Sequence, residues 1–318
     1  MRRSCLVQLT LLVILAATVA TGIRRYLLPT VAPTDKPPAT SRSEELSAGT
    51  RAVSREPLSV SLAAIAGATR VAKGIEGLAL GLVRPLMVDL PPSQGLAIHG
   101  TYLFVGAHDP DVRAALLYKL HRDTQTLVQM RVIAYGSLSV IGGLHGGQEF
   151  VWAALREEGG ERGALLGIDP LQLDIVKRFE IEQPVATIAE GPDGRLYSTD
   201  LGGQWLCKWS QDGQTLGCLP LANGARYTDM DVVNGSLVCA GRDSDGGVLD
   251  VYDLQSLTLL VRHRADARFQ DRALVSGAGF AYANGTFYFL PISGRYPMLL
   301  AYGLAGGALE DYVPSVRR

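Results

Sequence analysis

The amino-acid sequence predicts an all-β fold, and three observations lead to this prediction. Glycine is frequent, at 36 of 318 residues, while only 19% of the residues are charged, a balance that favours tight turns over long solvated helices. After residue 90 the chain repeats a pattern of apolar strand, tight turn and apolar strand. A second hairpin follows each copy at the same period. With 47% hydrophobic residues, the chain can also bury a substantial core.

Residues 1–25 are predicted to form an N-terminal transmembrane signal anchor. Residues 4–23 are twenty consecutive uncharged residues, a length that as a helix matches the hydrocarbon core of a membrane. Arg2 and Arg3 precede this run as in an export signal, and small residues at 18–20 would allow cleavage and secretion. Because Arg24 follows directly, we favour an uncleaved anchor, with the body outside the cytoplasm, in the periplasm or at the cell surface.

A flexible linker is expected between the anchor and the folded domain, over residues 26–60. From residue 29 onward this segment is rich in Pro, Ser, Thr and charged residues and lacks large apolar side chains, so it cannot bury enough surface to order itself. Residues 61–81 could form a short helix packed on the domain, although their glycines argue against it. The repeats then occupy the domain at 82–318.

Five copies of the first hairpin follow residue 90. Each copy places a tight turn between two apolar strands, and Asn-Gly or Asp-Gly suits such a turn because both central residues take a positive φ. The turn glycines are spaced by 47, 47, 41 and 50 residues, and they are Gly100, Gly147, Gly194, Gly235 and Gly285.

The second hairpin gives an independent register. Its apolar anchor positions are spaced by 49, 40, 43 and 51 residues, and they are Leu117, Leu166, Leu206, Leu249 and Leu300. Both registers agree on a period of 40 to 50 residues. Four short strands at this period are typical of a β-propeller, in which neighbouring blades bury one another's faces.

Closure of the ring completes the predicted fold. A ring of blades leaves no open edge when an N-terminal strand pairs with the last C-terminal blade. Residues 82–90 have the alternation for that strand, and residues 276–304 would supply the rest of the blade. The sequence therefore predicts five four-stranded blades, with six as the alternative if residues 61–90 contribute more than one strand.

Two segments of the second hairpin carry a family resemblance. GIDPLQLDIVKRFEI at 167–181 and VYDLQSLTLLVRH at 251–263 resemble YVTN-type and related propeller repeats. The region 90–304, which includes SQGLAIHGTYLFVG, also resembles an uncharacterised family of bacterial exported propeller proteins. The resemblance covers about two thirds of the chain and implies a propeller fold and an exported setting. The shared motifs are structural features of the blades, so the resemblance implies no catalytic residue.

Cys207 and Cys218 lie eleven positions apart around Asp212-Gly213. If that dipeptide centres a symmetric turn, the two cysteines are directly opposite, within reach of a disulfide. Two inert buried thiols are the main alternative. A zinc or redox site has less support, because no further ligand lies at a suitable spacing and the Cys-x-x-Cys pattern is missing. Cys239 is expected to be a small buried residue, and Cys5 lies in the apolar run.

Any function is expected on one face of the propeller and in its central funnel. The hairpin turns lie on one face, and the longer loops lie on the other, which we call the long-loop face. These loops join the second strand of a blade to the third, and each blade to the next. Binding residues concentrate on loops of a rigid scaffold. The long loops are predicted at 107–114, 154–163, 199–204, 241–247 and 291–296.

The innermost strands should direct one side chain each toward the funnel. These are Gln94, His145, Thr187, Asp229 and Ser276. His145 could act as a general base or a ligand, although a His among four glycines is more often a turn residue. Asp229 and Asp231 fall on one face by alternation and could hold a cation, or bond a backbone amide instead.

Four further residues complete the candidate ligand-binding set. Arg242 and Arg295 could hold an anion or pair with neighbouring acids. Asp243 opens the run Asp-Ser-Asp-Gly, which matches part of a calcium loop but lacks its third ligand and terminal Glu, so a solvated acidic turn is favoured. Asp200 is a further oxygen ligand that a cation in the funnel could use.

Two functions fit these observations. A formal charge of −1, from 30 basic and 31 acidic residues, gives no reason to expect nucleic acid as a partner, and no phosphate loop, nucleophile elbow or His-Glu-x-x-His motif occurs. The first function is a membrane-tethered, extracytoplasmic binding module for a protein or small polar ligand, without a cofactor. The alternative is a lactonase- or esterase-like hydrolase with a divalent cation such as Ca²⁺, held by Asp229, Asp200 and Gln94. Such a site needs three or four oxygen ligands from different blades, and the sequence supplies at most these three, with no acidic residue at the other innermost strands, which favours the binding module.

Overall fold

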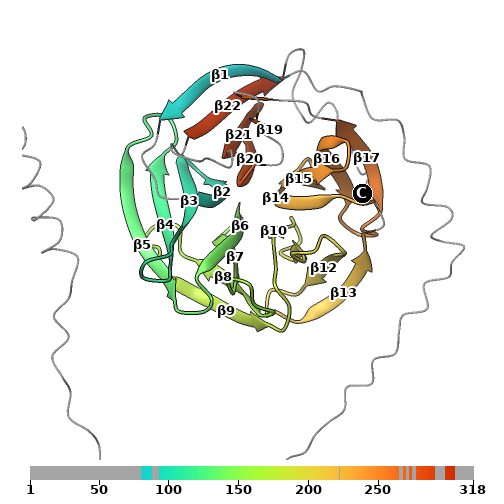
Figure 1. Cartoon of the computed structure of the whole chain (residues 1–318), viewed down its shortest axis with the longest axis horizontal. Coiled ribbons are helices and arrows are strands. Elements are labelled where there is room, and N and C mark those ends of the chain that lie inside the picture. Colours follow the sequence, from blue (N-terminus) through green and yellow to red (C-terminus); the bar gives the residue numbers. More distant parts are fainter. Residues whose placement is uncertain are drawn as a thin grey trace, which may run out of the picture. The chain divides into compact units, whose positions relative to one another are not determined.

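The computed structural model describes residues 80–87, 93–221, 223–264, 268–269, 272–273, 277–290 and 298–304. In this part of the chain the strands form antiparallel four-stranded sheets arranged around a common centre (Figure 1). The predicted anchor and linker, and most of the segment 61–81, lie outside the described residues. Among the described residues, no helix has the length and apolar character needed to cross a membrane.

Four blades are each built from four strands that are consecutive in the chain. The first strand of each blade lies nearest the centre and the fourth lies at the rim (Figure 1). Blade I contains β2 (Ser93–His99), β3 (Tyr102–Asp109), β4 (Ala114–His121) and β5 (Leu127–Tyr135). Blade II contains β6 (Val140–Gly146), β7 (Val151–Arg156), β8 (Gly163–Ile168) and β9 (Ile175–Ile181). Blade III contains β10 (Ala189–Glu190), β11 (Leu196–Thr199), β12 (Trp205–Trp209) and β13 (Thr215–Pro220). Blade IV contains β14 (Arg226–Val233), β15 (Ser236–Asp243), β16 (Gly246–Asp253) and β17 (Leu259–Arg264).

A further four-stranded sheet, the closing sheet, combines strands from both ends of the domain. Its order is β20 (Gly279–Ala283), β21 (Thr286–Leu290), β22 (Met298–Leu304) and β1 (Leu80–Met87). β1 and β22 are antiparallel, with Leu80 opposite Leu304 and Met87 opposite Met298. The predicted N-terminal closing strand is therefore present. It begins at Leu80 and not at residue 82, so it takes in the end of the segment that could have been helical.

One small sheet falls outside the predicted repeat. β18 (Arg268–Phe269) and β19 (Arg272–Ala273) form a two-stranded sheet between β17 and β20 in the chain. Strands of two residues are too short to produce a periodic sequence pattern, and for this reason the sequence did not predict them.

The turn residues follow the predicted chemistry, with one exception. Both residues of Asn234-Gly235 and of Asn284-Gly285 have positive φ, between 50° and 74°, as two-residue hairpin turns require. Gly100 and Gly194 also have positive φ. At Gly147 the turn is wider, and its N–H donates a hydrogen bond to the carbonyl of Phe150. The five leucines of the second register all lie in the third strand of their sheet.

The two segments that resemble YVTN-type repeats form equivalent turns between the third and fourth strands. The carboxylates of Asp169 and Asp253 each accept hydrogen bonds from two backbone N–H groups of their own turn, at 2.7 to 3.0 Å. A lysine of the preceding blade then donates to a carbonyl of this turn, Lys119 at 3.3 Å and Lys208 at 3.1 Å. The motif therefore fixes a turn and ties adjacent blades together.

The core lies between neighbouring sheets. Four interfaces contain a cluster of buried side chains. Members of these clusters are Phe104, Leu117, Leu144 and Leu166 between blades I and II, Trp152, Leu165, Leu196 and Trp209 between blades II and III, Tyr197, Leu206, Leu237 and Val248 between blades III and IV, and Leu96, Leu103, Ala281 and Leu290 between the closing sheet and blade I. At these interfaces neighbouring sheets bury each other's faces, which a blade could not do alone.

Cys207 on β12 and Cys218 on β13 form the predicted disulfide, with Cα atoms 4.0 Å apart. The turn between them is not symmetric, because Gly213 adopts a φ of 76° and a β-bulge lies between Lys208 and Trp209. The bulge lies on the turn side of the cysteines, so the predicted opposition is kept. A bond that closes so short a loop contributes up to about 3 kcal/mol. Cys239 is a free, buried cysteine, as predicted.

Candidate functional site

Asp229 lies on the innermost strand of blade IV and has no exposed surface. Its Oδ2 atom accepts hydrogen bonds from the backbone N–H of Leu96, at 3.1 Å, and of Phe280, at 3.0 Å. Its Oδ1 atom accepts one from the N–H of Met230, at 3.1 Å. Leu96 belongs to β2 of blade I and Phe280 to β20 of the closing sheet. One carboxylate therefore joins the inner strands of three sheets.

The surroundings of Asp229 leave it little freedom. Burial raises the pKa of this carboxyl well above its usual value, and the hydrogen bonds from Phe280, Leu96 and Met230 act in the opposite direction. On the side of blade II, a Cβ atom at Gly143 would lie 2.8 Å from Oδ1 of Asp229. Because glycine has no Cβ atom, the inner strand of blade II can lie this close to the carboxylate of Asp229. The predicted funnel residue is thus part of the interior, with its oxygens directed at backbone amides.

Asp231 repeats this arrangement two residues further along β14. Its Oδ2 accepts a hydrogen bond from the N–H of Tyr282 at 2.9 Å, and its Oδ1 accepts one from the N–H of Val232 at 2.8 Å. The Nδ1 atom of His145 lies 3.1 Å from Oδ1 of Asp231, and the His145 side chain is 6% exposed. Both carboxylates therefore lie on one face of β14, as alternation predicted, and accept hydrogen bonds from β20. His145 contacts the second of them.

The remaining predicted site residues are dispersed. Thr187 is buried and its Oγ1 lies 2.9 Å from Oγ1 of Thr199, and Gln94 is partly exposed at the start of β2. The carboxylate of Asp200 accepts hydrogen bonds from three backbone N–H groups between residues 202 and 205, which organises its own turn. Arg242 is exposed. Ser276 and Arg295 lie outside the described residues.

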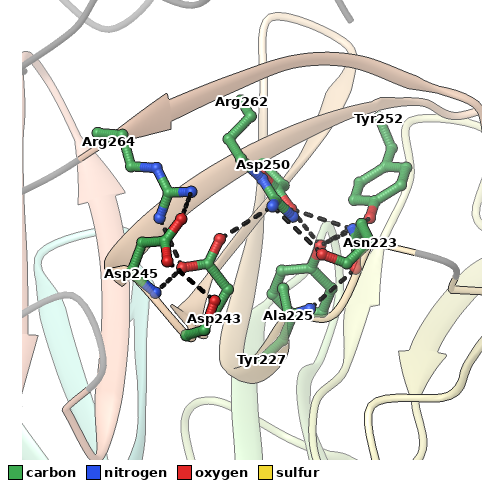
Figure 2. Close-up of polar contacts among 10 residues, drawn as sticks. Asn223, Ala225, Tyr227, Asp243, Asp245, Asp250, Tyr252, Arg262 and Arg264 are labelled. Carbon is green, nitrogen blue, oxygen red and sulfur yellow. Dashed lines mark hydrogen bonds and ion pairs between the residues drawn. The ribbon is translucent and has the colours of Figure 1, made fainter. Parts of the chain in front are cut away.

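Asp250 forms the centre of a polar network in blade IV that the sequence analysis missed (Figure 2). Its side chain is fully buried, and Arg262 binds it in a bidentate manner, with Nε 2.7 Å from Oδ1 and Nη2 2.6 Å from Oδ2. Tyr227 and Asn223 also donate to Oδ2, and the hydroxyl of Tyr252 lies 2.6 Å from that of Tyr227. Burial raises the pKa of both tyrosines, which keeps them as neutral donors.

The network continues to the long-loop face through Asp243. Its carboxylate pairs with Arg262 at 3.0 Å and with Arg264 at 2.5 Å, and only 7% of its side chain is exposed. Burial acts to raise the pKa of Asp243, but the hydrogen bonds from Arg264 and from the N–H of Asp245 outweigh it and lower the pKa. The expected solvated acidic turn is therefore wrong for Asp243, because two arginines of β17 cover it.

One feature of the sequence could have indicated this network. Asp250 interrupts the otherwise apolar run VLDVY of β16, and Arg262 stands directly opposite it on β17. An acid inside a buried strand needs a partner. Identifying that partner required the register of β16 and β17, which the sequence did not supply.

A pocket of about 160 Å³ lies on the long-loop face between blades I and II. Arg113 comes from the loop between β3 and β4, Ser137 and Ser139 from the connection between β5 and β6, and Glu157 and Glu158 from the loop between β7 and β8. Two of these segments, 107–114 and 154–163, were predicted long loops of this face. The sequence placed the loops correctly but could not show that they meet.

Several polar contacts lie beside the pocket. His108 bonds the carbonyl of Ser139 through Nδ1 at 2.9 Å, and its Nε2 lies 4.0 Å from Oε2 of Glu158. Arg162 pairs with Glu157 at 2.5 Å, and this hydrogen bond lowers the pKa of the Glu157 carboxyl. Arg156 precedes these two glutamates, and burial lowers the pKa of its guanidinium. The pocket therefore combines carboxylate acceptors with a guanidinium donor on the loops that line it.

The residues described by the structure contain no group of three or more His, Cys, Asp or Glu side chains placed to hold a metal ion. Asp229 and Asp200, the two acids proposed for a cation, each use their carboxylate on three backbone amides. Their roles in the structure are to close the centre and to shape a turn.

Replacing Asp229 with alanine is expected to destabilise the domain by about 3 kcal/mol or more. The change leaves three buried N–H groups without an acceptor, and each such group costs about 1 to 3 kcal/mol. Chemical denaturation of the purified domain measures the loss in the free energy of unfolding. Asp245→Ala, at a side chain 72% exposed, is the control and should change that free energy by about 0.5 kcal/mol or less. Equal effects of the two substitutions would contradict the role of Asp229.

Replacing Arg262 with methionine is expected to destabilise the domain by about 3 to 5 kcal/mol, because Asp250 would keep a buried charge without its partner. Arg264→Met is the matched control. Its side chain is 33% exposed, and Asp243 keeps its pairing with Arg262 when Arg264 is replaced, so a smaller loss is expected. Thermal unfolding followed by circular dichroism compares the two. If both variants melt at the same temperature, Arg262 does not have the role described.

No protein-family model and no curated protein matches the chain. Solved structures do match. The glutaminyl cyclase of Myxococcus xanthus has a TM-score of 0.54 at 15% identity, over 73% of this chain and 98% of that chain. A streptogramin B lyase has a TM-score of 0.43 at 12% identity, over 70% and 73% of the two chains. The PQQ-bound aldose sugar dehydrogenase of Streptomyces coelicolor has a TM-score of 0.41 at 11% identity, over 71% and 98%.

The glutaminyl cyclase is a β-propeller protein, and at 15% identity the likeness to it concerns the fold alone. It agrees with the sheets arranged around a common centre. The predicted β-propeller class is confirmed, with four complete consecutive blades in the part of the chain that the structure describes.

Proposed function

We propose that the protein is a membrane-tethered, extracytoplasmic β-propeller that binds a small polar ligand in the pocket between blades I and II. The observation that carries this proposal is the pocket itself, which three loops of the long-loop face build from charged and hydroxyl side chains. Loops on a rigid scaffold are where binding residues concentrate. The protein performs no chemistry on the ligand in this proposal.

The propeller in this proposal has five blades, with the closing sheet as the fifth. Supporting this number, β1 pairs with β22 along seven positions, which joins a strand from before blade I to strands from after blade IV. A ring closed in this way leaves no strand edge open between the chain ends. Buried side chains also fill the interface between the closing sheet and blade I.

The alternative, a metal-dependent hydrolase in the central funnel, has less support. A divalent cation needs several free oxygen ligands that converge, whereas Asp229 and Asp200 are engaged with backbone amides. The glutaminyl cyclase shares the fold at 15% identity, which transfers no residue role. Turnover of lactones or esters that is lost on chelation and regained with Ca²⁺ or Zn²⁺ would favour the hydrolase.

Filling the pocket should abolish ligand binding without unfolding the domain. Ser137→Trp places a large ring at an exposed position of the pocket lining, and Ser244→Trp does the same at an exposed turn of blade IV. Saturation-transfer NMR with a library of small polar metabolites should find ligands that bind the wild type and Ser244→Trp but not Ser137→Trp. Ligands that bind Ser137→Trp equally well, or a library without any binder, would contradict the proposal.

The tether and its orientation have a separate test. An alkaline phosphatase fused after residue 318 is expected to be active in whole cells and to stay with the membrane fraction, because this enzyme matures only outside a reducing cytoplasm. Removing residues 1–25 should leave the fusion inactive and soluble. Activity of the intact fusion in the culture medium would show a cleaved signal, and an inactive intact fusion would place the body in the cytoplasm.

A further inference from the structure

We infer that the pocket between blades I and II recognises a neutral, polyhydroxylated ligand, a sugar ring. The inference rests on the proposed function, because it names the ligand class of the same pocket. It follows from the balance of charge in and around the pocket and from the mixture of donors and acceptors in its lining.

The charges in and around the pocket nearly cancel. Glu157 and Glu158 bring two negative charges to the lining and Arg113 brings one positive charge. Arg162 pairs with Glu157, and Arg156 interacts electrostatically with Glu158. A small anion would meet two carboxylates, and a cation would meet the guanidinium of Arg113. A ligand without formal charge avoids both penalties.

The polar lining nevertheless favours a ligand with many hydrogen-bond donor and acceptor groups. Ionised carboxylates only accept hydrogen bonds, and a guanidinium only donates them, whereas a hydroxyl group does both. Adjacent hydroxyl groups can therefore donate to Glu157 and Glu158 and accept from Arg113 at the same time. Hydrogen bonds to charged partners are the stronger kind. Neighbouring hydroxyls on a small ring meet this demand without adding charge.

The walls that present these groups are fixed before a ligand arrives. His108 ties the carbonyl of Ser139 to blade I across the blade interface, and the Nε2 atom of this histidine has no hydrogen-bond partner among the described residues. A carbonyl oxygen only accepts hydrogen bonds, so Nδ1 of His108 donates this one. His108 is a positioning residue in this inference.

Saturation-transfer NMR on the full domain tests this inference with methyl glycosides of glucose, galactose, mannose and N-acetylglucosamine. Inorganic phosphate and glycine serve as charged comparison probes. At least one glycoside should bind, and Glu158→Gln should weaken its binding about tenfold or more, since a hydrogen bond to a charged acceptor is lost. Glu149→Gln, at an exposed position in the turn between β6 and β7, should leave the affinity unchanged.

The outcomes separate this inference from the proposed function. If phosphate or glycine binds in place of the glycosides and Ser137→Trp removes that binding, the pocket binds ligands but the sugar class is overturned. If a glycoside binds equally well to Ser137→Trp, its site lies elsewhere and the inference fails. If no probe binds, the sugar class is overturned, and the metabolite library decides the proposed function independently. Equal weakening by Glu158→Gln and Glu149→Gln would also count against the assigned contact.

Discussion

The buried carboxylate of Asp229 is the constraint on which the rest of the structure depends. A charged or polar group without access to water must find its hydrogen-bond partners inside the protein. Asp229 finds them on the inner strands of blade I and the closing sheet, through the amides of Leu96 and Phe280. The inner strands must approach closely to supply these donors, and Gly143 removes the side chain that would prevent it on the side of blade II. These contacts fix the inner strands of blade I, blade IV and the closing sheet relative to one another.

The central carboxylates of Asp229 and Asp231 already accept hydrogen bonds from backbone amides, so side chains that could bind a ligand lie further from the centre. Asp231 and His145 extend the same axial contacts, and the network around Asp250 satisfies the polar groups of blade IV among themselves (Figure 2). Between blades I and II the loops instead leave a pocket lined with carboxylates, hydroxyls and a guanidinium. The polar side chains of blade IV therefore bond one another, whereas those of the pocket between blades I and II leave room for a ligand. Arginines of β17 cover Asp243, whereas Arg113 and Glu158 line open space.

The fold could be predicted from the sequence because it is periodic. The turn glycines and the leucines of the third strands repeat every 40 to 50 residues, and the opposition of Cys207 and Cys218 follows from simple counting along one hairpin. The candidate site could not be predicted in the same way, because its contacts join different blades. The partner amides of Asp229 are 133 and 51 residues away in the chain. A sequence period fixes what lies within a blade, but the meeting of loops depends on how blades are placed around the ring.

The most direct test of the central claim is native-state hydrogen exchange of the amides of Leu96 and Phe280. If both donate to a buried axial carboxylate that locks the ring, their protons exchange only when the whole domain unfolds, at the same rate as the most protected amides of β15. Exchange at the rate of amides in the exposed turn between β15 and β16, under conditions where the domain stays folded, would show that the centre is open to water and that Asp229 does not hold the sheets together.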